Sequence, residues 1–413
     1  MMSPPILLVA DKNKQIYDLP GFLACGQAGP QISVLSPKQL IPLPKDSNLF
    51  FLPNRYPVGF NIQKNTYEPM ANCSPVAAFI PPGYTQTLTA AYAEAKDAEL
   101  LPLFSYAPVA YYKGAFYIPA IRIDQRKNHD LSSLDKKMLC KKIQVFEGTK
   151  NRLITHLAGC AQVNSCPNAI NFFLGKYEAP LPVSPSCNAR CLGCISAQPK
   201  GSCPATQPRI TFVPTPEEIA EVALTHINRV SRSIVSFGQG CEGEPLLNAA
   251  IIKKAINIIR KETSRGTIHM NTNAGRTKDV EALCKAGLNS MRVSLNSVRP
   301  DLYHSYYSPR DYTFSDVIAS IVTAKQHKKF IALNYLVMPG LTDTKEEFQK
   351  LVKFIHKTRV DMIQWRNLNY DPQRYLKKMD QNNKSPLLGI KTIIQLLQKQ
   401  FPKLRHGYFN IPQ

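Results

Sequence analysis

Three cysteines within eight residues offer the clearest chemistry in this chain of 413 residues. They stand in Cys187-Asn-Ala-Arg-Cys191-Leu-Gly-Cys194, at positions i, i+4 and i+7. Thiolates at this spacing can converge from one tight loop on three irons of a four-iron cluster, because thiolates are the usual ligands of iron–sulfur clusters. The fourth iron would stay open for chemistry. A structural zinc site usually closes with four ligands, often from paired CxxC motifs, and no second CxxC occurs here, although Cys203 could be a fourth ligand.

Further cysteines lie close to this triplet along the chain. Seven of the 11 cysteines fall within residues 160–241. In a chain without a secretory signal, such a density indicates metal or redox ligands rather than disulfides. Two interpretations stay open for the additional thiols: ligands of an auxiliary iron–sulfur cluster, or buried cysteines that act as small apolar side chains. The additional thiols are those of Cys160, Cys166, Cys203 and Cys241.

Alternating strands and helices must position these cysteines. Short apolar runs predict strands over 233–237, 266–271, 290–295, 330–337 and 361–365, with one more near the cysteines. Between them, helices are predicted over 215–224, 248–261, 278–286, 314–325 and 344–357. Such alternation implies parallel strands joined by right-handed crossovers, and hence an α/β fold. A partial barrel fits the strand count, and a doubly wound open sheet is the alternative.

The chain divides into four parts. We expect an N-terminal domain of unknown role over 1–150, a Cys- and Pro-containing bridge over 151–186, the α/β unit over 187–370, and a C-terminal helix and tail packed on it over 371–413. In the first part, Lys113-Gly114 predicts the turn of a hairpin between 107–112 and 115–123. Residues 89–100 predict a helix by propensity, and 386–398 an amphipathic helix.

The CxxxCxxC spacing resembles the signature of the radical S-adenosylmethionine (radical SAM) superfamily. In that family, three cysteines hold a 4Fe-4S cluster whose open iron chelates SAM, and reductive cleavage yields a 5′-deoxyadenosyl radical that abstracts hydrogen from the substrate. The resemblance covers about residues 183–370. It implies a partial (β/α)6 TIM-like barrel preceded by a β-rich α+β N-terminal domain, with Cys187, Cys191 and Cys194 as metal ligands. One departure is Gly193, where the family often has an aromatic or aliphatic residue near adenine.

The ends of the predicted strands resemble the SAM-binding elements of the same family. Residues 238–247 are similar to its GGEP element, in which a glutamate would accept from the SAM ammonium. Residues 269–274, 292–297 and 335–343 are similar to its third-, fourth- and fifth-strand elements. The alternative for each of these polar side chains is a structural role, with its hydrogen bonds satisfied in a loop or in the barrel interior. The resemblance implies these cofactor-binding residues: Gly243, Glu244, Pro245, Asn273, Ser294 and Asn296.

Charge and hydropathy restrict the partners. The chain has 51 basic and 29 acidic side chains, which give a net charge of +22. Residues 151–413 hold 35 of the basic and 18 of the acidic side chains. This surplus favours polyanionic partners, and the alternative explanation is a lysine-rich surface that is simply solvated. No apolar run is long enough for a membrane span, and the N-terminus lacks a basic region typical of signal peptides, so we expect a cytoplasmic protein with no membrane partner.

These observations predict a radical SAM enzyme with an unidentified substrate, for which RNA and a peptide or protein are the candidates. The family resemblance also implies a reductant such as flavodoxin or ferredoxin. A non-catalytic iron–sulfur or zinc protein that binds nucleic acid is the alternative. The fold and cofactor do not name the substrate, and no catalytic residue toward it is predicted.

Overall fold

Seven parallel strands form the sheet that carries the cysteine loop. The computed structural model describes residues 4–126, 128, 134–379 and 385–413. In a doubly wound sheet the strand order reverses at a switch point, whereas here it follows the chain throughout. This confirms the predicted barrel-type fold over the open alternative. The strands are β16 (Glu178–Pro180), β17 (Ile234–Phe237), β18 (Thr267–Thr272), β19 (Ser290–Leu295), β20 (Phe330–Val337), β21 (Met362–Asn367) and β22 (Arg405–Gly407).

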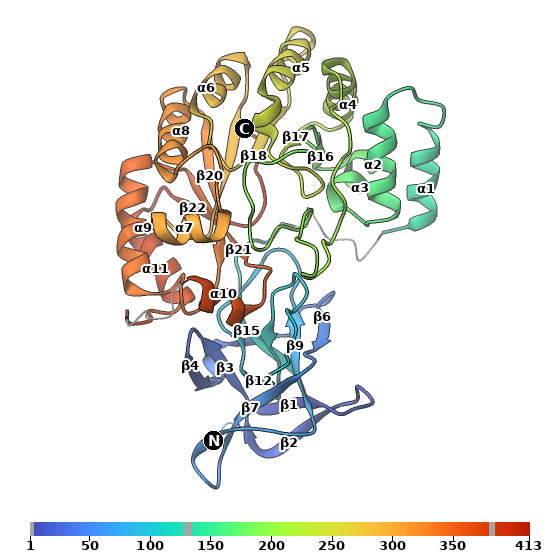
Figure 1. The fold of residues 1–413 in the computed structure, drawn as a ribbon. Coiled ribbons are helices and arrows are strands. Elements are labelled where there is room, and N and C mark those ends of the chain that lie inside the picture. The colour runs from blue at the N-terminus through green and yellow to red at the C-terminus, as the bar shows by residue number, and fades with distance from the viewer. Residues whose placement is uncertain (1–3, 127, 129–133, 380–384) are drawn as a thin grey trace.

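Helices in the crossovers cover the outer face of this sheet, and Figure 1 shows them in an arc around it. The first of them starts at Thr215, whose side chain accepts from the backbone N–H of Glu218 in a capping box. The helices predicted for the crossovers are confirmed to within a few residues, whereas the helices over 300–307 and 372–379 were not predicted. The helices are α4 (Pro216–Arg229), α5 (Ala249–Glu262), α6 (Thr277–Ala286), α7 (Pro300–Tyr307), α8 (Phe314–Gln326), α9 (Lys345–Thr358), α10 (Pro372–Met379) and α11 (Ile390–Gln400).

The segment 151–186, expected as a bridge, carries two helices and the first strand of the sheet. It contains α2 (Arg152–Gln162), α3 (Pro167–Leu174) and β16, and α1 (Lys136–Gln144) precedes it. Apolar side chains of all three helices share one buried core with the sheet. The prolines that indicated a linker lie on and after β16, an edge strand, where a missing backbone N–H is tolerated.

The N-terminal region consists of antiparallel strands. The Lys113-Gly114 hairpin is confirmed, since both residues have the positive φ, 49° and 77°, that a type I′ turn requires. The strands are β1 (Ile6–Ala10), β2 (Ile16–Leu23), β3 (Cys25–Ala28), β4 (Gln31–Val34), β5 (Leu40–Pro42), β6 (Asn48–Phe51), β7 (Arg55–Asn61), β8 (Thr66–Pro69), β9 (Ser74–Phe79), β10 (Tyr84–Gln86), β11 (Thr89–Ala90), β12 (Tyr92–Glu94), β13 (Ala107–Pro108), β14 (Ala110–Tyr112) and β15 (Ala115–Arg122).

The helix predicted over residues 89–100 is wrong. The segment forms β11 and β12, which pair with β3 and β7. Ala90 and Tyr92 are buried in a cluster with Leu101 and Tyr106. Pairing and burial against distant strands therefore override the local helix propensity of this alanine-rich stretch.

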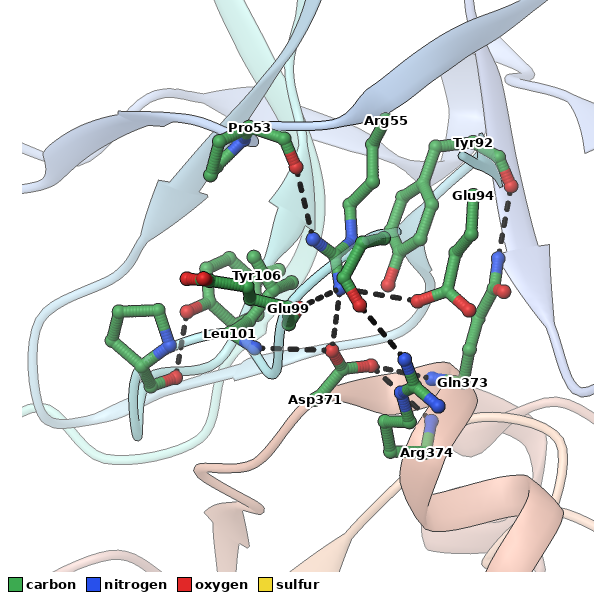
Figure 2. A network of polar contacts seen from close by, with 12 residues as sticks. Pro53, Arg55, Tyr92, Glu94, Glu99, Leu101, Tyr106, Asp371, Gln373 and Arg374 are labelled. Atoms are coloured by element: carbon green, nitrogen blue, oxygen red, sulfur yellow. Dashed lines mark hydrogen bonds and ion pairs between the residues drawn. The ribbon is translucent and has the colours of Figure 1, made fainter. Parts of the chain in front are cut away.

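The β-rich region lies against the carboxyl ends of β20 and β21, at the bottom of Figure 1. Thr85 Oγ1 donates to the carbonyl oxygen of Trp365 over 2.7 Å. After β20, the backbones of Gly29 and Gly340 approach so closely that a Cβ on Gly340 would lie 1.7 Å from the Gly29 nitrogen. A further network around Arg55 and Asp371 crosses the same contact (Figure 2). The cysteine-containing sheet and the β-rich region are thus fastened together at the end of the sheet where barrel enzymes place their sites.

The C-terminal tail links β16, at one edge of the sheet, to β21, which lies next to the opposite edge strand. Asn410 Nδ2 donates to Glu178 Oε1 on β16 over 2.9 Å, and Gln364 Nε2 on β21 donates to Asn410 Oδ1 over 3.1 Å. Side chains of the tail thereby join strands that are far apart in the sheet order. None of the helices in the described ranges combines the length and apolar composition needed to cross a membrane.

Candidate functional site

A cavity of about 620 Å³ lies at the carboxyl ends of the parallel strands. Active sites of β/α barrels lie at this end, because the strands present their terminal loops there. The β-rich region contributes Phe79 to the lining. The cysteine loop contributes Cys187, Cys191 and Cys194 to the wall, and the segments at the ends of β17 and β18 contribute residues 242–245 and 271–273. Other wall residues are Arg292 and Ser294 from β19, Asn334 from β20 and Arg366 from β21.

The three predicted metal ligands meet at one wall of this cavity. Burial raises the pKa of the Cys187 thiol to about 11 and that of Cys191 well above its usual value. Burial also acts on Cys194, but hydrogen bonds from Ser196 and the neighbouring Arg209 outweigh it and lower that pKa. The guanidinium Nη2 of Arg209 lies 3.4 Å from Cys194 Sγ. A cationic donor beside one thiol favours the thiolate that binds metal.

Among the described residues, the cysteine triplet is not the group arranged for a single ion. In the described part of the chain, one group of candidate ligand atoms lies entirely within 4.8 Å, and it is not this triplet. Cys203, the alternative fourth ligand, is buried and does not line the cavity. Three thiols without a fourth protein ligand fit a 4Fe-4S cluster with an open iron.

Backbone hydrogen bonds to α7 hold the cysteine loop in place. The amides of Arg190 and Leu192 donate to the carbonyl oxygens of Tyr307 and Tyr306 over 2.8 and 3.0 Å. The same packing explains the departure at Gly193. A Cβ there would lie 2.9 Å from both the Tyr306 hydroxyl and the Asn369 carbonyl oxygen, too close for any larger residue without a shift of the loop.

Glu244 and Asn273 connect the cysteine loop to the strand ends. Glu244 accepts from Thr272 Oγ1 over 2.5 Å, and from the backbone amides of Asn273 and Leu246 over 2.8 and 3.1 Å. Burial raises the pKa of Glu244 to about 7. Asn273 Nδ2 donates to Asn188 Oδ1 over 2.8 Å, and Asn188 belongs to the CxxxCxxC loop. The two predicted residues thus lie together in one network at the cavity wall.

Glu242 holds the loop after β17, a role that sequence reasoning missed. Its carboxylate accepts from the amides of Gly238 and Gln239 over 2.6 and 2.7 Å, and from those of Val183 and Ser184 over 2.8 and 3.0 Å. Burial raises its pKa to about 7. Glu242 stands two residues before Glu244, within the segment 238–247 that resembles the GGEP element. Nothing in the spacing of this segment distinguished Glu242 as a functional residue.

Gly243 and Pro245, the other predicted residues of this loop, also line the cavity. A Cβ on Gly243 would lie 1.9 Å from the carbonyl oxygen of Ser186, directly before the first cysteine. The glycine therefore permits the loop after β17 and the cysteine loop to touch. Pro245 is the first residue of a short 3-10 helix, η2 (Pro245–Asn248), where its fixed φ is favourable.

The structure separates the two predicted polar residues of the fourth strand. Ser294 lines the cavity, and its Oγ accepts from Asn334 Nδ2 over 3.4 Å. Asn296 does not line it; its amide donates to the Leu302 carbonyl oxygen and the Tyr375 hydroxyl, both over 3.1 Å. Asn296 lies beyond Leu295, the last residue of β19, so the alternation of side chains along the strand does not place it on the same face as Ser294.

Two arginines, Arg292 and Arg366, also line the cavity wall. The Nε of Arg292 is buried without a hydrogen-bond partner among the described residues, while Nη1 donates to Gln364 over 3.1 Å. Burial, with the charge of Arg366, lowers the pKa of Arg292 to about 9. The Arg366 guanidinium lies 4.2 Å from the centre of the Tyr408 ring. Trp365 is fully buried in the core and donates to His406.

Part of this chain is similar to known proteins. Residues 181–355 match the family model described as the Radical SAM superfamily. The chain is 28% identical over 190 residues to a GTP 3',8-cyclase of Marinobacter nauticus, covering 44% of this chain and 51% of that protein. It is 29% identical over 182 residues to the dual-specificity RNA methyltransferase RlmN of Lawsonia intracellularis, covering 41% of this chain and 49% of that protein.

The chain thus spans about half the length of these curated relatives. Among solved structures, a radical SAM methyltransferase from Sphaerobacter thermophilus has 14% identity and a TM-score of 0.39, over 55% of this chain and 66% of that one. Enzymes of this superfamily use a 4Fe-4S cluster and SAM. Residues 181–355 of this chain form a radical SAM domain.

Proposed function

We propose that this chain is a radical SAM enzyme that holds a 4Fe-4S cluster through Cys187, Cys191 and Cys194 and binds SAM in the adjoining cavity. The supporting observation is that the three thiols share one wall of a cavity of about 620 Å³ at the carboxyl ends of a parallel sheet. When bound, these cofactors supply the reductive cleavage of SAM that starts the radical reactions of the family. The chain's own residues must bind and orient SAM and the substrate.

The cavity wall offers complementary groups for each part of SAM. A carboxylate has about four acceptor positions, and Glu244 uses three of them, so that one is left for the ammonium of the methionine part. The unpartnered Nε of Arg292 is a donor for a carboxylate or another anionic group. We propose Ser294 for a ribose or carboxylate contact, Asn273 as a wall residue and Asn296 as a support behind the wall.

The substrate that we propose is RNA or a polypeptide, and the electron donor is a reductant such as flavodoxin or ferredoxin. The net charge of +22 supports an anionic partner. One relative carries the name of an RNA methyltransferase, which favours RNA of the two. The eleven cysteines are all free thiols in the structure, which supports a reducing compartment such as the cytoplasm.

Anaerobic reconstitution tests this function. The protein would be loaded with iron and sulfide, reduced with dithionite and supplied with SAM, and 5′-deoxyadenosine and methionine would be measured. We expect both products and a change in the EPR signal of the reduced cluster on addition of SAM. The alternative, a non-catalytic iron–sulfur or zinc protein that binds nucleic acid, predicts bound metal without either effect, and that result would refute the proposal.

A further inference from the structure

A second group of metal-ligating side chains lies outside the cysteine loop. His156 and Cys160 stand four residues apart on α2, and therefore on the same face of the helix. Cys241 belongs to the loop after β17. The Nε2 of His156 lies 3.4 Å from Cys160 Sγ, and the candidate ligand atoms of all three residues lie within 4.8 Å of one another.

These distances fit one ion. With Zn–S bonds near 2.3 Å and Zn–N bonds near 2.0–2.1 Å, two ligand atoms of a tetrahedral zinc lie about 3.5–3.8 Å apart. The three side chains need only small adjustments to reach this arrangement. Ligands of an iron–sulfur cluster bind separate irons and lie farther apart, so an auxiliary cluster suits this group less well than a single ion.

The chemistry of the donors also fits a single divalent ion. Two thiolates and a neutral imidazole would balance the charge of a divalent cation, which limits the cost of burying it. Cys160 and Cys241 are each 4% exposed, and the ring of half-buried His156 packs edge-to-face against Phe212. Thiolate and imidazole ligands together are typical of zinc, and three protein ligands leave a fourth position for water.

The position of Cys241 gives such an ion a role. Its neighbours Gly240 and Glu242 both line the cavity, while its own side chain is turned to α2. The backbone of Cys241 is further held by its carbonyl oxygen, which accepts from the amide of Ile210 over 2.8 Å. A metal bound here would cross-link α2 to the loop that carries Glu242 and Glu244.

We propose that His156, Cys160 and Cys241 bind one divalent cation of the zinc class, which fixes the loop over residues 238–245 against α2. This site does not depend on whether the protein cleaves SAM. Its occupancy can therefore be measured in protein that has lost the cluster ligands, so that failure of one proposal leaves the other intact.

The test uses the full chain with Cys187→Ala, Cys191→Ala and Cys194→Ala, produced with added zinc and purified anaerobically. We expect about one zinc per chain by mass spectrometry. Adding Cys160→Ser or Cys241→Ser should remove nearly all of it. Cys284→Ser is the matched control, because Cys284 is a similarly buried thiol on α6, 3% exposed and outside the group, and zinc should be retained.

A spectroscopic measurement keeps the test valid if a serine variant misfolds. The triple-alanine protein would be loaded with Co²⁺ in place of zinc, and its absorption spectrum should show thiolate-to-cobalt charge transfer and tetrahedral d–d bands. A spectrum without thiolate bands overturns the proposal. So does zinc retention in folded Cys241→Ser protein, zinc content near zero in the triple-alanine protein, or a Cys160–Cys241 disulfide in place of two metal-bound thiols.

Discussion

The guanidinium of Arg55 donates to the carboxylate of Asp371 over 2.8 Å, and both side chains are fully buried (Figure 2). Arg55 belongs to β7 of the β-rich region, and Asp371 stands between β21 of the parallel sheet and α10. The same guanidinium nitrogen donates to Glu94 and to the carbonyl oxygen of Glu99, and Asp371 also accepts from the amide of Leu101. This ion pair therefore fastens the β-rich region beside the mouth of the cavity.

Breaking this pair should destabilise the protein strongly. Asp371→Asn would leave a buried guanidinium without its main counter-charge, and we expect the free energy of unfolding to fall by about 3–5 kcal/mol. Urea unfolding followed by the fluorescence of Trp365, the one tryptophan of the chain, measures it. Glu94→Gln is the control, because Glu94 is 22% exposed and its pair should contribute under about 1 kcal/mol. Equal losses in both variants would contradict the assigned role of Asp371.

Removal of a single loop cysteine should abolish cluster binding. In Cys191→Ala protein, two thiols cannot hold a cluster firmly, so iron after reconstitution should fall from about four per chain to less than one. Iron and sulfide analysis and the loss of the brown absorbance measure this. Cys203→Ala is the matched control, because Cys203 stands only nine residues after Cys194 but does not line the cavity. Iron loss in the control and retention in the Cys191 variant would reverse the assignment.

The two asparagines assigned from sequence motifs should differ in their effects on SAM. Asn273→Ala removes a hydrogen bond of 2.8 Å to the cysteine loop at the cavity wall, and we expect SAM affinity to fall about tenfold. Asn296→Ala should lower the free energy of unfolding by about 1–2 kcal/mol, because the Tyr375 hydroxyl loses a donor, but leave SAM affinity within about twofold. Equilibrium binding of SAM to reconstituted protein, together with urea unfolding, separates the two effects.

A buried histidine should make the protein sensitive to acid. Asn271 donates through Nδ2 to carbonyl oxygens, so its Oδ1 faces His269 and the imidazole Nε2 must donate to it. Burial, and next the charge of Arg292, lowers the pKa of His269 to about 3. The unfolded chain binds this proton near pH 6.5, so the stability due to neutral His269 is fully present above about pH 6.5 and is lost as the pH falls toward 3.

We expect the contribution of neutral His269 to the free energy of unfolding to fall by about 2 kcal/mol between pH 7.5 and pH 5. His269→Gln should remove this share of the pH dependence of unfolding. His304→Gln is the control, since His304 is exposed, and its pH dependence should match that of the unmodified protein. An unchanged slope in the His269 variant, measured by urea unfolding at both pH values, would show that this imidazole does not contribute.

Local patterns determined much of the fold and of the cluster site. The CxxxCxxC loop, the alternation of strands and helices and the Lys113-Gly114 hairpin depend on spacing and backbone preferences within about ten residues, and a sequence displays these directly. For the same reason, Gly243 and Glu244 were predicted beside the cysteines, because both stand in a short motif at a strand end.

Contacts between distant segments decided the rest. Asn296 lies outside the cavity because β19 ends one residue earlier, and residues 89–100 form strands because their partners are β3 and β7. His156 meets Cys241 across 85 positions of sequence, and Arg55 meets Asp371 across 316. Such pairs carry no periodic signal in the chain, since only the packing of the complete core brings their side chains within bonding distance.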